Sequence, residues 1–140
     1  MSGVLHQATC VAIGGRGLLI EGRPGSGKSS LALALIDRGA ILVGDDGVLI
    51  ERDGERLLVS PAPVTAGLLE VRNVGLINFP TLSRIPVALL IGLDPAAPRF
   101  RDAPVFLERA GVSVPAISLW PDSPILALRA ELALRTYGLA

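Results

Sequence analysis

A run of eight residues has the composition and spacing of a loop that binds phosphate. It matches the pattern G-x-x-x-x-G-K-[ST] and consists of Gly22, Arg23, Pro24, Gly25, Ser26, Gly27, Lys28 and Ser29. Glycines let successive backbone N–H groups turn towards anionic oxygens, and a helix that begins near Lys28 would add the positive end of its dipole. The Lys28 ammonium can reach the β- and γ-phosphates, and the Ser29 hydroxyl can bind Mg²⁺. This loop, with Ser30 after it, therefore predicts a site for the phosphates of a purine nucleotide.

Two adjacent carboxylates, Asp45 and Asp46, follow the apolar run of residues 40–43. If that run is a strand parallel to the one before the loop, its end lies beside the loop, where ligands collect in open α/β sheets. A bound nucleotide needs such a carboxylate near its metal ion. The doublet with Gly47 could also form only a turn, because Asp and Gly favour turns. Loop and doublet together leave three classes open: an ATPase, a small-molecule kinase and a protein kinase.

The elements that must hold these residues are mostly short strands. Residues 17–21 predict an apolar strand that leads into the loop, and residues 28–38 predict a helix that ends at Gly39. Asp53-Gly54, between two short apolar runs, predicts a β-hairpin. Other strands are predicted over residues 4–12, 40–43, 86–93 and 114–119.

Three further segments complete the expected architecture. Residues 105–110 predict a short helix, and Ser123 with Pro124 predicts the start of a last helix. Residues 68–72 fit either the end of a helix or a strand. We therefore expect an α/β fold with a mixed sheet and flanking helices.

The composition fits one domain over residues 1–140. Half of the residues are hydrophobic but only 4% are aromatic, so the core must consist mainly of Val, Ile, Leu and Ala. The 13 basic and 13 acidic residues are interspersed, which argues against a nucleic-acid partner, and no apolar run approaches the ~20 residues of a membrane span. Cys10 is the only cysteine, which favours a reducing, cytoplasmic location and a buried thiol. The high apolar content suggests a homo-oligomer.

Three blocks of sequence, in this order, together indicate a family. They are His6 with residues 14–17 and 22–29; Arg38-Gly39 with Leu42-Val43-Gly44-Asp45-Asp46; and residues 69–78, L-E-V-R-N-V-G-L-I-N. The last two are similar to R-G-x-x-L-V-A-D-D and L-E-[IV]-R-G-[LV]-G-[IL]-[IL]-[DN] of the HPr kinase/phosphorylases. The chain therefore resembles their C-terminal catalytic domain, which implies a P-loop-containing fold like that of PEP carboxykinase. It also implies a kinase that uses ATP and Mg²⁺ to phosphorylate a seryl residue of the phosphocarrier protein HPr.

The resemblance implies a role for individual residues, position by position. Asp46 falls at the carboxylate that accepts the serine proton, and Ser29 and Glu70 fall at the Mg²⁺ ligands. Lys28 and His6 fall at other active-site positions. On the residues alone, a single histidine on a strand is more often a structural residue; with the resemblance, both readings of His6 stay open.

An arginine from a loop also serves the site of this family. Arg99 is the best match, with Arg101 close behind. Arg99 could instead be an ordinary loop cation, and Glu70 and Arg72 could form a solvated pair of little energetic value.

The sequence departs from the family pattern in two main places, and Asn73 also replaces the glycine of the family signature. The chain starts almost at His6, so it resembles the short single-domain forms of some proteobacteria. The segment P-V-x-P-G-R-N, tied in the family to reverse phosphorolysis, here reads L-W-P-D-S-P-I at residues 119–125. We therefore expect an HPr kinase that regulates carbohydrate and nitrogen metabolism through the phosphotransferase system, without efficient phosphorylase activity. The alternatives are a P-loop kinase of a small metabolite and a non-catalytic nucleotide-sensing module.

Overall fold

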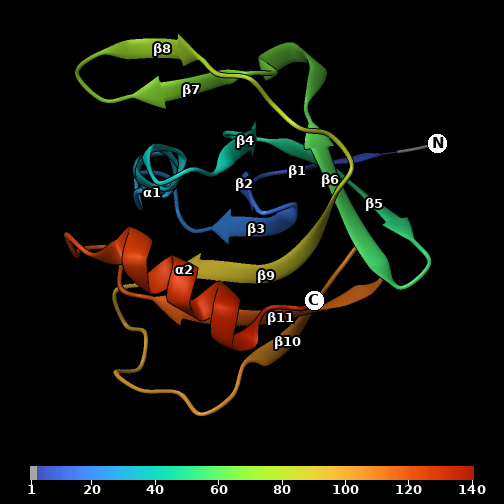
Figure 1. Cartoon of the computed structure of the whole chain (residues 1–140), viewed down its shortest axis with the longest axis vertical. Helices are drawn as coiled ribbons and strands as arrows, with labels where there is room; N and C mark the ends of the chain where they lie inside the picture. The colour runs from blue at the N-terminus through green and yellow to red at the C-terminus, as the bar shows by residue number, and fades with distance from the viewer. Residues whose placement is uncertain (1–2) are drawn as a thin grey trace.

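A curled mixed sheet flanked by helices forms the body of the protein in a computed structural model that describes residues 3–140 (Figure 1). Its strands are β1 (Val4–His6), β2 (Thr9–Ile13), β3 (Arg16–Glu21), β4 (Ile41–Gly44), β5 (Val48–Asp53), β6 (Arg56–Pro61), β7 (Leu68–Val71), β8 (Gly75–Asn78), β9 (Ile85–Leu93), β10 (Val105–Arg109) and β11 (Val112–Leu119). Its helices are α1 (Lys28–Asp37) and α2 (Leu126–Tyr137), with a short 3₁₀ helix at Pro63–Thr65. β7 and β8 form a separate two-stranded hairpin. The expected α/β fold with a mixed sheet is therefore confirmed.

The strand order brings several strand ends to one edge of the sheet. β3 pairs in parallel with β9, and β9 pairs in parallel with β11. β4 is not a direct neighbour of β3, because β2 lies between them and runs antiparallel to both. Because β2 is antiparallel to both β3 and β4, these two strands run in the same direction. The chain therefore leaves both strands, towards residues 22–29 and towards Asp45, at the same edge.

The two faces of the sheet bury two apolar clusters. Side chains alternate between the faces along a strand, so Leu18 and Ile20 of β3 pack under α1, α2 and β7, whereas Leu19 points into the curl formed with β5, β6 and β11. Cys10 lies in this second cluster, where burial raises the pKa of its thiol to about 12. The prediction of a buried cysteine on a strand is confirmed.

Helix α1 ends where the sequence predicts. Gly39 has a φ of 108°, a left-handed conformation that glycine adopts without strain. The N–H groups of Gly39 and Ala40 donate to the carbonyl oxygens of Ile36 and Leu35, each at 3.0 Å. These two bonds form the C-terminal closure that glycine commonly provides, and they direct the chain into β4.

The helix predicted over residues 105–110 is wrong. This segment is β10, which pairs antiparallel with β11. Ala110 and Gly111, with φ of 49° and 81°, join the two strands, and two successive positive φ values are typical of a tight hairpin turn. Pairing with β11 satisfies the backbone groups of β10, and this outweighs the weak helical preference of so short a segment.

Two other segments differ from the prediction, and a third resolves an alternative that the sequence left open. Residues 4–12 are two strands, because the chain bends at Ala8, whose carbonyl accepts the N–H of Gly47 at 3.0 Å. Ser123 does not cap α2; its hydroxyl accepts the N–H of Ile125 at 3.2 Å in the turn before the helix. Residues 68–72 are mainly strand, as β7 shows.

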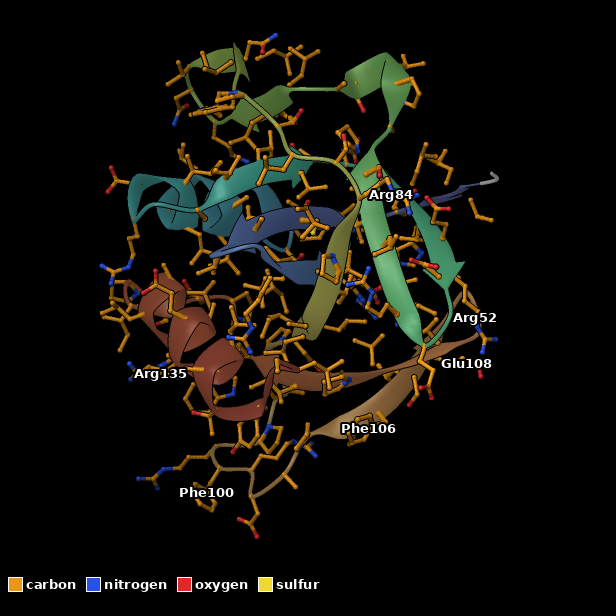
Figure 2. All side chains as sticks on the ribbon, turned by 45° about the vertical axis from the view of Figure 1, so that its right-hand side comes forward. Arg52, Arg84, Phe100, Phe106, Glu108 and Arg135 are labelled. Carbon is orange, nitrogen blue, oxygen red and sulfur yellow. The ribbon has the colours of Figure 1, made fainter. Side chains whose placement is uncertain are left out.

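Apolar side chains are exposed on β10 and on the loop before it. Phe106 is 60% exposed and Phe100 is 80% exposed, and both lie on the outer side of the protein (Figure 2). The homo-oligomer suggested by the composition stays a prediction. Neither helix of the described chain, residues 3–140, has the length and apolar character needed to cross a membrane.

Candidate active site

The loop of residues 22–29, called the glycine loop below, leaves the end of β3 and enters α1. Gly25 and Gly27 have φ of 80° and 103°, and a Cβ atom at either position would meet nothing within 4 Å. Ser26 Oγ is buried and finds no hydrogen-bond partner within residues 3–140. Buried hydroxyls normally have a partner, so this oxygen, in a loop that leads into a helix N-terminus, fits a site that an anionic ligand completes.

The Lys28 side chain folds back over the loop that precedes it. Its ammonium donates to the carbonyl oxygens of Gly22 and Arg23 at 3.0 and 3.1 Å. Both bonds are to neutral acceptors, so the positive charge is not neutralised by them. The loop therefore holds its lysine in place and leaves that charge for a phosphate group.

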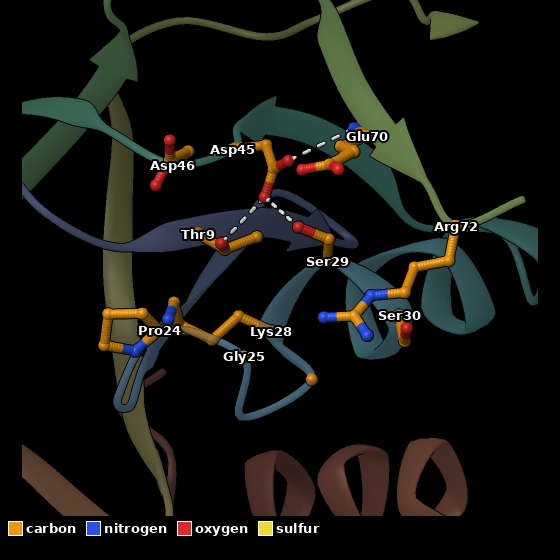
Figure 3. A pocket seen from close by; sticks show the side chains of 11 residues that line it. Thr9, Pro24, Gly25, Lys28, Ser29, Ser30, Asp45, Asp46, Glu70 and Arg72 are labelled. Atoms are coloured by element: carbon orange, nitrogen blue, oxygen red, sulfur yellow. Dashed lines mark hydrogen bonds between the residues drawn. The ribbon is translucent and has the colours of Figure 1, made fainter. Parts of the chain in front are cut away.

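Asp45 is the carboxylate that the fold buries beside the glycine loop. It is 5% exposed, and its Oδ1 accepts hydrogen bonds from the hydroxyls of Ser29 at 2.7 Å and Thr9 at 2.9 Å. Its Oδ2 accepts the backbone N–H of Glu70 at 3.4 Å (Figure 3). A buried charge is tolerated only when it is paired or hydrogen-bonded, and these donors from α1, β2 and β7 fix the carboxylate.

Asp46 follows directly but has a different environment. It is exposed, and its Oδ1 accepts one hydrogen bond, from the Gln7 side chain at 3.2 Å. Its φ of 55° is in the left-handed region, which Asp and Asn tolerate better than most residues. This turn of the backbone separates the two side chains, so that Asp45 points into the protein and Asp46 remains open to solvent.

A pocket of about 370 Å³ lies between the glycine loop, the aspartate doublet and β7. It is lined by Thr9, Pro24, Gly25, Gly27, Lys28, Ser29, Ser30, Asp45, Asp46, Glu70 and Arg72. Figure 3 shows Arg72 extending from the end of β7 towards the glycine loop, across from the two aspartates. Among the ion pairs found within residues 3–140, Glu70 and Arg72 do not pair with each other, so the expected alternative of a solvated pair is not seen. The structure therefore gathers most of the predicted site residues around one space.

The donor groups in this pocket fit Mg²⁺. Ser29 Oγ and Asp45 Oδ1 are 2.7 Å apart, and the Glu70 carboxylate lines the same pocket. Mg²⁺ prefers oxygen ligands and usually binds through one or two carboxylates together with substrate phosphates. Residues 3–140 contain no group of three or more His, Cys, Asp or Glu side chains that could hold a metal ion alone. The donor set thus matches an ion that is held jointly by protein and phosphate.

Comparison with known proteins identifies the family. Residues 2–84, more than half of the chain, match the model of the HPr Serine kinase C-terminal domain. The chain belongs to this family. The resemblance predicted from the three sequence blocks is confirmed.

Individual relatives agree with the family match. The HPr kinase/phosphorylase of an Exiguobacterium strain is 42% identical over 102 residues, which cover 67% of this chain and 31% of the relative. That of Clostridium tetani is 49% identical over 72 residues, covering 51% of this chain and 24% of the relative. The chain thus matches about a third or less of the length of these curated relatives. The solved Hpr(Ser) kinase/phosphatase from Coxiella burnetii has a TM-score of 0.81 at 31% identity, covering 94% of this chain and 88% of that one.

His6 lies outside the pocket and binds Glu21, the last residue before the glycine loop. His6 Nε2 and Glu21 Oε2 are 2.6 Å apart, and Arg109 at the end of β10 donates to both oxygens of the same carboxylate at 2.7 and 2.9 Å. Burial alone would raise the pKa of the Glu21 carboxyl, but the hydrogen bonds and charges of Arg109 and His6 outweigh it and hold this pKa below its ordinary value. The active-site role implied for His6 stays a prediction.

Replacing Arg109 by glutamine is expected to lower the free energy of unfolding by about 1–3 kcal/mol near neutral pH, because Glu21 then keeps only His6 as a partner. The pKa of Glu21 is lower in the folded domain than its ordinary value of 4.5, so the stabilisation is present above that value. It is lost as the pH falls through the folded-state pKa. Urea unfolding should therefore show the difference between wild type and variant shrinking as the pH falls below 4.5. A difference that does not change with pH would contradict the role of this ion pair.

Arg99 also lies outside the pocket beside the glycine loop. It lines a second pocket together with Trp120 and Arg129. Arg101, the other predicted candidate, contributes its backbone carbonyl to a hydrogen bond with the Tyr137 hydroxyl at 2.8 Å. Arg72 is the arginine that the structure brings to the glycine loop. A catalytic role of Arg99 therefore stays a prediction.

Two residues of this site, Thr9 and Arg72, were not assigned a role from the sequence, and Asp45 was predicted only as one member of the aspartate doublet. Asp45 and Thr9 form its buried hydrogen-bonded pair, and Arg72 lines the pocket. The sequence could have pointed to Thr9, because it is a polar residue at the start of an apolar strand. It could also have pointed to Arg72, since residues i and i+2 of a strand share a face and Glu70 was already predicted to bind the metal.

Proposed function

We propose that the chain is the catalytic domain of an ATP-dependent kinase that phosphorylates a seryl residue of HPr or an HPr-like phosphocarrier protein. The observation that carries the proposal is the meeting of the glycine loop, Lys28 and two aspartates of different exposure in one pocket. The names of the relatives support this acceptor: HPr kinase/phosphorylase and Hpr(Ser) kinase/phosphatase. Through HPr the enzyme regulates carbohydrate and nitrogen metabolism by way of the phosphotransferase system, in the cytoplasm.

In this proposal the glycine loop holds the phosphates of ATP. Backbone N–H groups of the loop and of the first turn of α1 face the anionic oxygens, as helix N-termini do in other phosphate sites. Lys28 and Arg72 place positive charge beside the phosphoryl group that is transferred. The transition state of this transfer is loose and spreads negative charge over the equatorial oxygens, so fixed cations there lower its free energy.

Asp46 orients the serine hydroxyl of the acceptor and takes its proton. It suits this role because it is exposed, so a serine on the surface of another protein can reach it. Asp45 does not suit it, because it is buried and both of its oxygens already accept hydrogen bonds. The bent backbone at Asp46 thus gives two neighbouring carboxylates two separate tasks.

The second task is to hold Mg²⁺. Ser29, Asp45 and Glu70 are the protein groups that would bind the ion, together with oxygens of the nucleotide. When bound, the ion offsets negative charge on the phosphates. Thr9 and the backbone N–H of Glu70 keep the Asp45 carboxylate aimed at Ser29.

The test is incubation of the purified protein with γ-labelled ATP, Mg²⁺ and HPr. Label should appear on HPr, and it should be absent when the acceptor serine of HPr is alanine or when Lys28 is replaced by alanine. Label on a low-mass product without HPr would instead assign a small-metabolite kinase. Tight ATP binding without turnover would assign a nucleotide-sensing module. Addition of inorganic phosphate to phosphorylated HPr should release little label, since residues 119–125 lack the glycine and arginine of the phosphorolysis segment.

A further inference from the structure

An ion-pair cluster outside the pocket joins three strands that are not neighbours in the sheet. The cluster consists of His6, the last residue of β1, Glu21, the last residue of β3, and Arg109, the last residue of β10, and it is called the Glu21 cluster below. In the sheet, three strands separate β1 from β3, and two separate β3 from β10. The curl of the sheet brings these strand ends together, so side-chain contacts connect them where backbone pairing does not.

Glu21 is the centre of the cluster. Arg109 donates to both of its carboxylate oxygens, at 2.7 and 2.9 Å, and two such bonds fix the plane of a carboxylate. A carboxylate only accepts hydrogen bonds, so His6 Nε2–H is the donor in the bond of 2.6 Å to Glu21 Oε2. The three side chains are 20–24% exposed, so water and salt screen these contacts less than at an open surface. Arg109 therefore holds Glu21 in the orientation that binds His6.

The segment that follows β1 lies against Asp46. The Gln7 side chain donates to Asp46 Oδ1 at 3.2 Å, and the carbonyl oxygen of Ala8 accepts the N–H of Gly47 at 3.0 Å. In addition, β1 pairs antiparallel with β5, which begins two residues after Asp46. The segment that carries Asp46 is thus attached to the end of β1.

The other side of the cluster leads into the glycine loop. Glu21 directly precedes this loop, and Asp46 lies across the pocket from Lys28 (Figure 3). Within the pocket, the hydrogen bond of 2.7 Å between Ser29 and Asp45 joins these two sides. Outside it, the Glu21 cluster joins them through the end of β1. A displacement of about 1 Å between reacting groups can slow a reaction by about 10²-fold, so this second connection has a kinetic consequence.

We propose that Arg109 is a positioning residue for phosphoryl transfer, because its bonds to Glu21 fix the segment that carries Asp46 relative to the glycine loop. Arg109 does not line the pocket, so it acts only through other side chains. Burial raises the pKa of the Glu21 carboxyl, and the bonds from Arg109 and His6 lower it by more, so Arg109 also keeps Glu21 charged. The inference rests on the role proposed for Asp46.

The test separates the rate of transfer from the binding of ATP. Arg109→Gln should slow single-turnover transfer of labelled phosphate to HPr at saturating ATP about tenfold. The Kd of ATP with Mg²⁺, measured by calorimetry, should change less than about twofold, because the glycine loop keeps its own contacts. Arg109→Lys keeps the charge but not the two parallel bonds, so its rate should lie between those of wild type and Arg109→Gln. Arg38→Gln is the matched control: it breaks an ion pair of 2.9 Å to Glu131 of α2 and should transfer at the wild-type rate.

A double variant tests whether Arg109 acts through Glu21. Glu21→Gln keeps the shape of the side chain, but its amide NH₂ group faces one of two donors and breaks the same cluster. Combined with Arg109→Gln, it should be about as slow as either single variant, because each change removes the same interaction. Rate effects that multiply would mean that Arg109 acts elsewhere, and they would overturn the proposal.

A measurement without acceptor keeps this inference separate from the proposed function. Amide hydrogen exchange of Gly47, relative to the slowest amides of the domain, should be about tenfold faster in Arg109→Gln and unchanged in Arg38→Gln. If the wild type did not phosphorylate HPr, the proposed function would fail, and the exchange of Gly47 would still decide the role of Arg109. Transfer by Arg109→Gln at the wild-type rate, a loss confined to ATP binding, or unchanged exchange of Gly47 would each overturn the proposal.

Discussion

Replacing Asp46 by asparagine is expected to slow phosphoryl transfer to HPr by about 10²–10⁴-fold and to leave ATP binding nearly unchanged. Asparagine keeps the shape of the side chain but cannot take the serine proton. It also tolerates the left-handed φ of 55° at this position, so the turn should be preserved. Because Asp46 is exposed and Asp45 holds the buried contacts, the stability of the domain should change little.

The measurement is single-turnover transfer of labelled phosphate to HPr, combined with calorimetry of ATP binding in the presence of Mg²⁺. Gln7→Ala is the matched control, because it removes the hydrogen bond to Asp46 at 3.2 Å and leaves the carboxylate in place. We expect this control to reduce the rate far less than Asp46→Asn. Transfer that persists at the wild-type rate in Asp46→Asn would rule out Asp46 as the base.

Local sequence signals predicted the parts of the fold in which neighbouring residues decide the structure. The hairpin at Asp53-Gly54 is present, and Gly54 has a φ of 63°. The hairpin at Ala110-Gly111 was missed, because alanine at a position with φ of 49° is unusual and gives no turn signal. Pairing of β10 with β11 holds that alanine in place. Such a tertiary contact cannot be predicted from the local sequence of the segment.

The site shows the same division between local and long-range information. The glycine loop could be predicted because its pattern lies in eight consecutive residues. The different environments of Asp45 and Asp46 could not, because the burial of Asp45 depends on Thr9, which is 36 residues away, and on Glu70, which is 25 residues away. His6 and Arg99 were placed by resemblance alone, and the structure directs them to Glu21 and to the second pocket.

Replacing Asp45 by asparagine should impair the use of Mg²⁺ and not proton transfer. The hydroxyls of Ser29 and Thr9 can still donate to the remaining oxygen of the side chain. The new amide NH₂ group, however, would face the N–H of Glu70, and the side chain would no longer carry a negative charge. We expect the Mg²⁺ concentration for half-maximal activity to rise about tenfold or more, and the free energy of unfolding to fall by about 1–3 kcal/mol. A Mg²⁺ titration of transfer at saturating ATP, together with urea unfolding, measures both effects.

Thr9→Val separates the metal effect from the structural effect of Asp45→Asn. It removes the hydroxyl that donates to Asp45 at 2.9 Å, so it should lower stability by a similar amount while the carboxylate keeps its charge. Its Mg²⁺ requirement should therefore rise much less than that of Asp45→Asn. Asp46→Asn should show the opposite pattern, a low rate with an unchanged Mg²⁺ requirement, because that side chain does not contact Ser29. If Asp45→Asn and Thr9→Val shifted the Mg²⁺ titration equally, Asp45 would be a structural residue and the metal would depend on Ser29 and Glu70 alone.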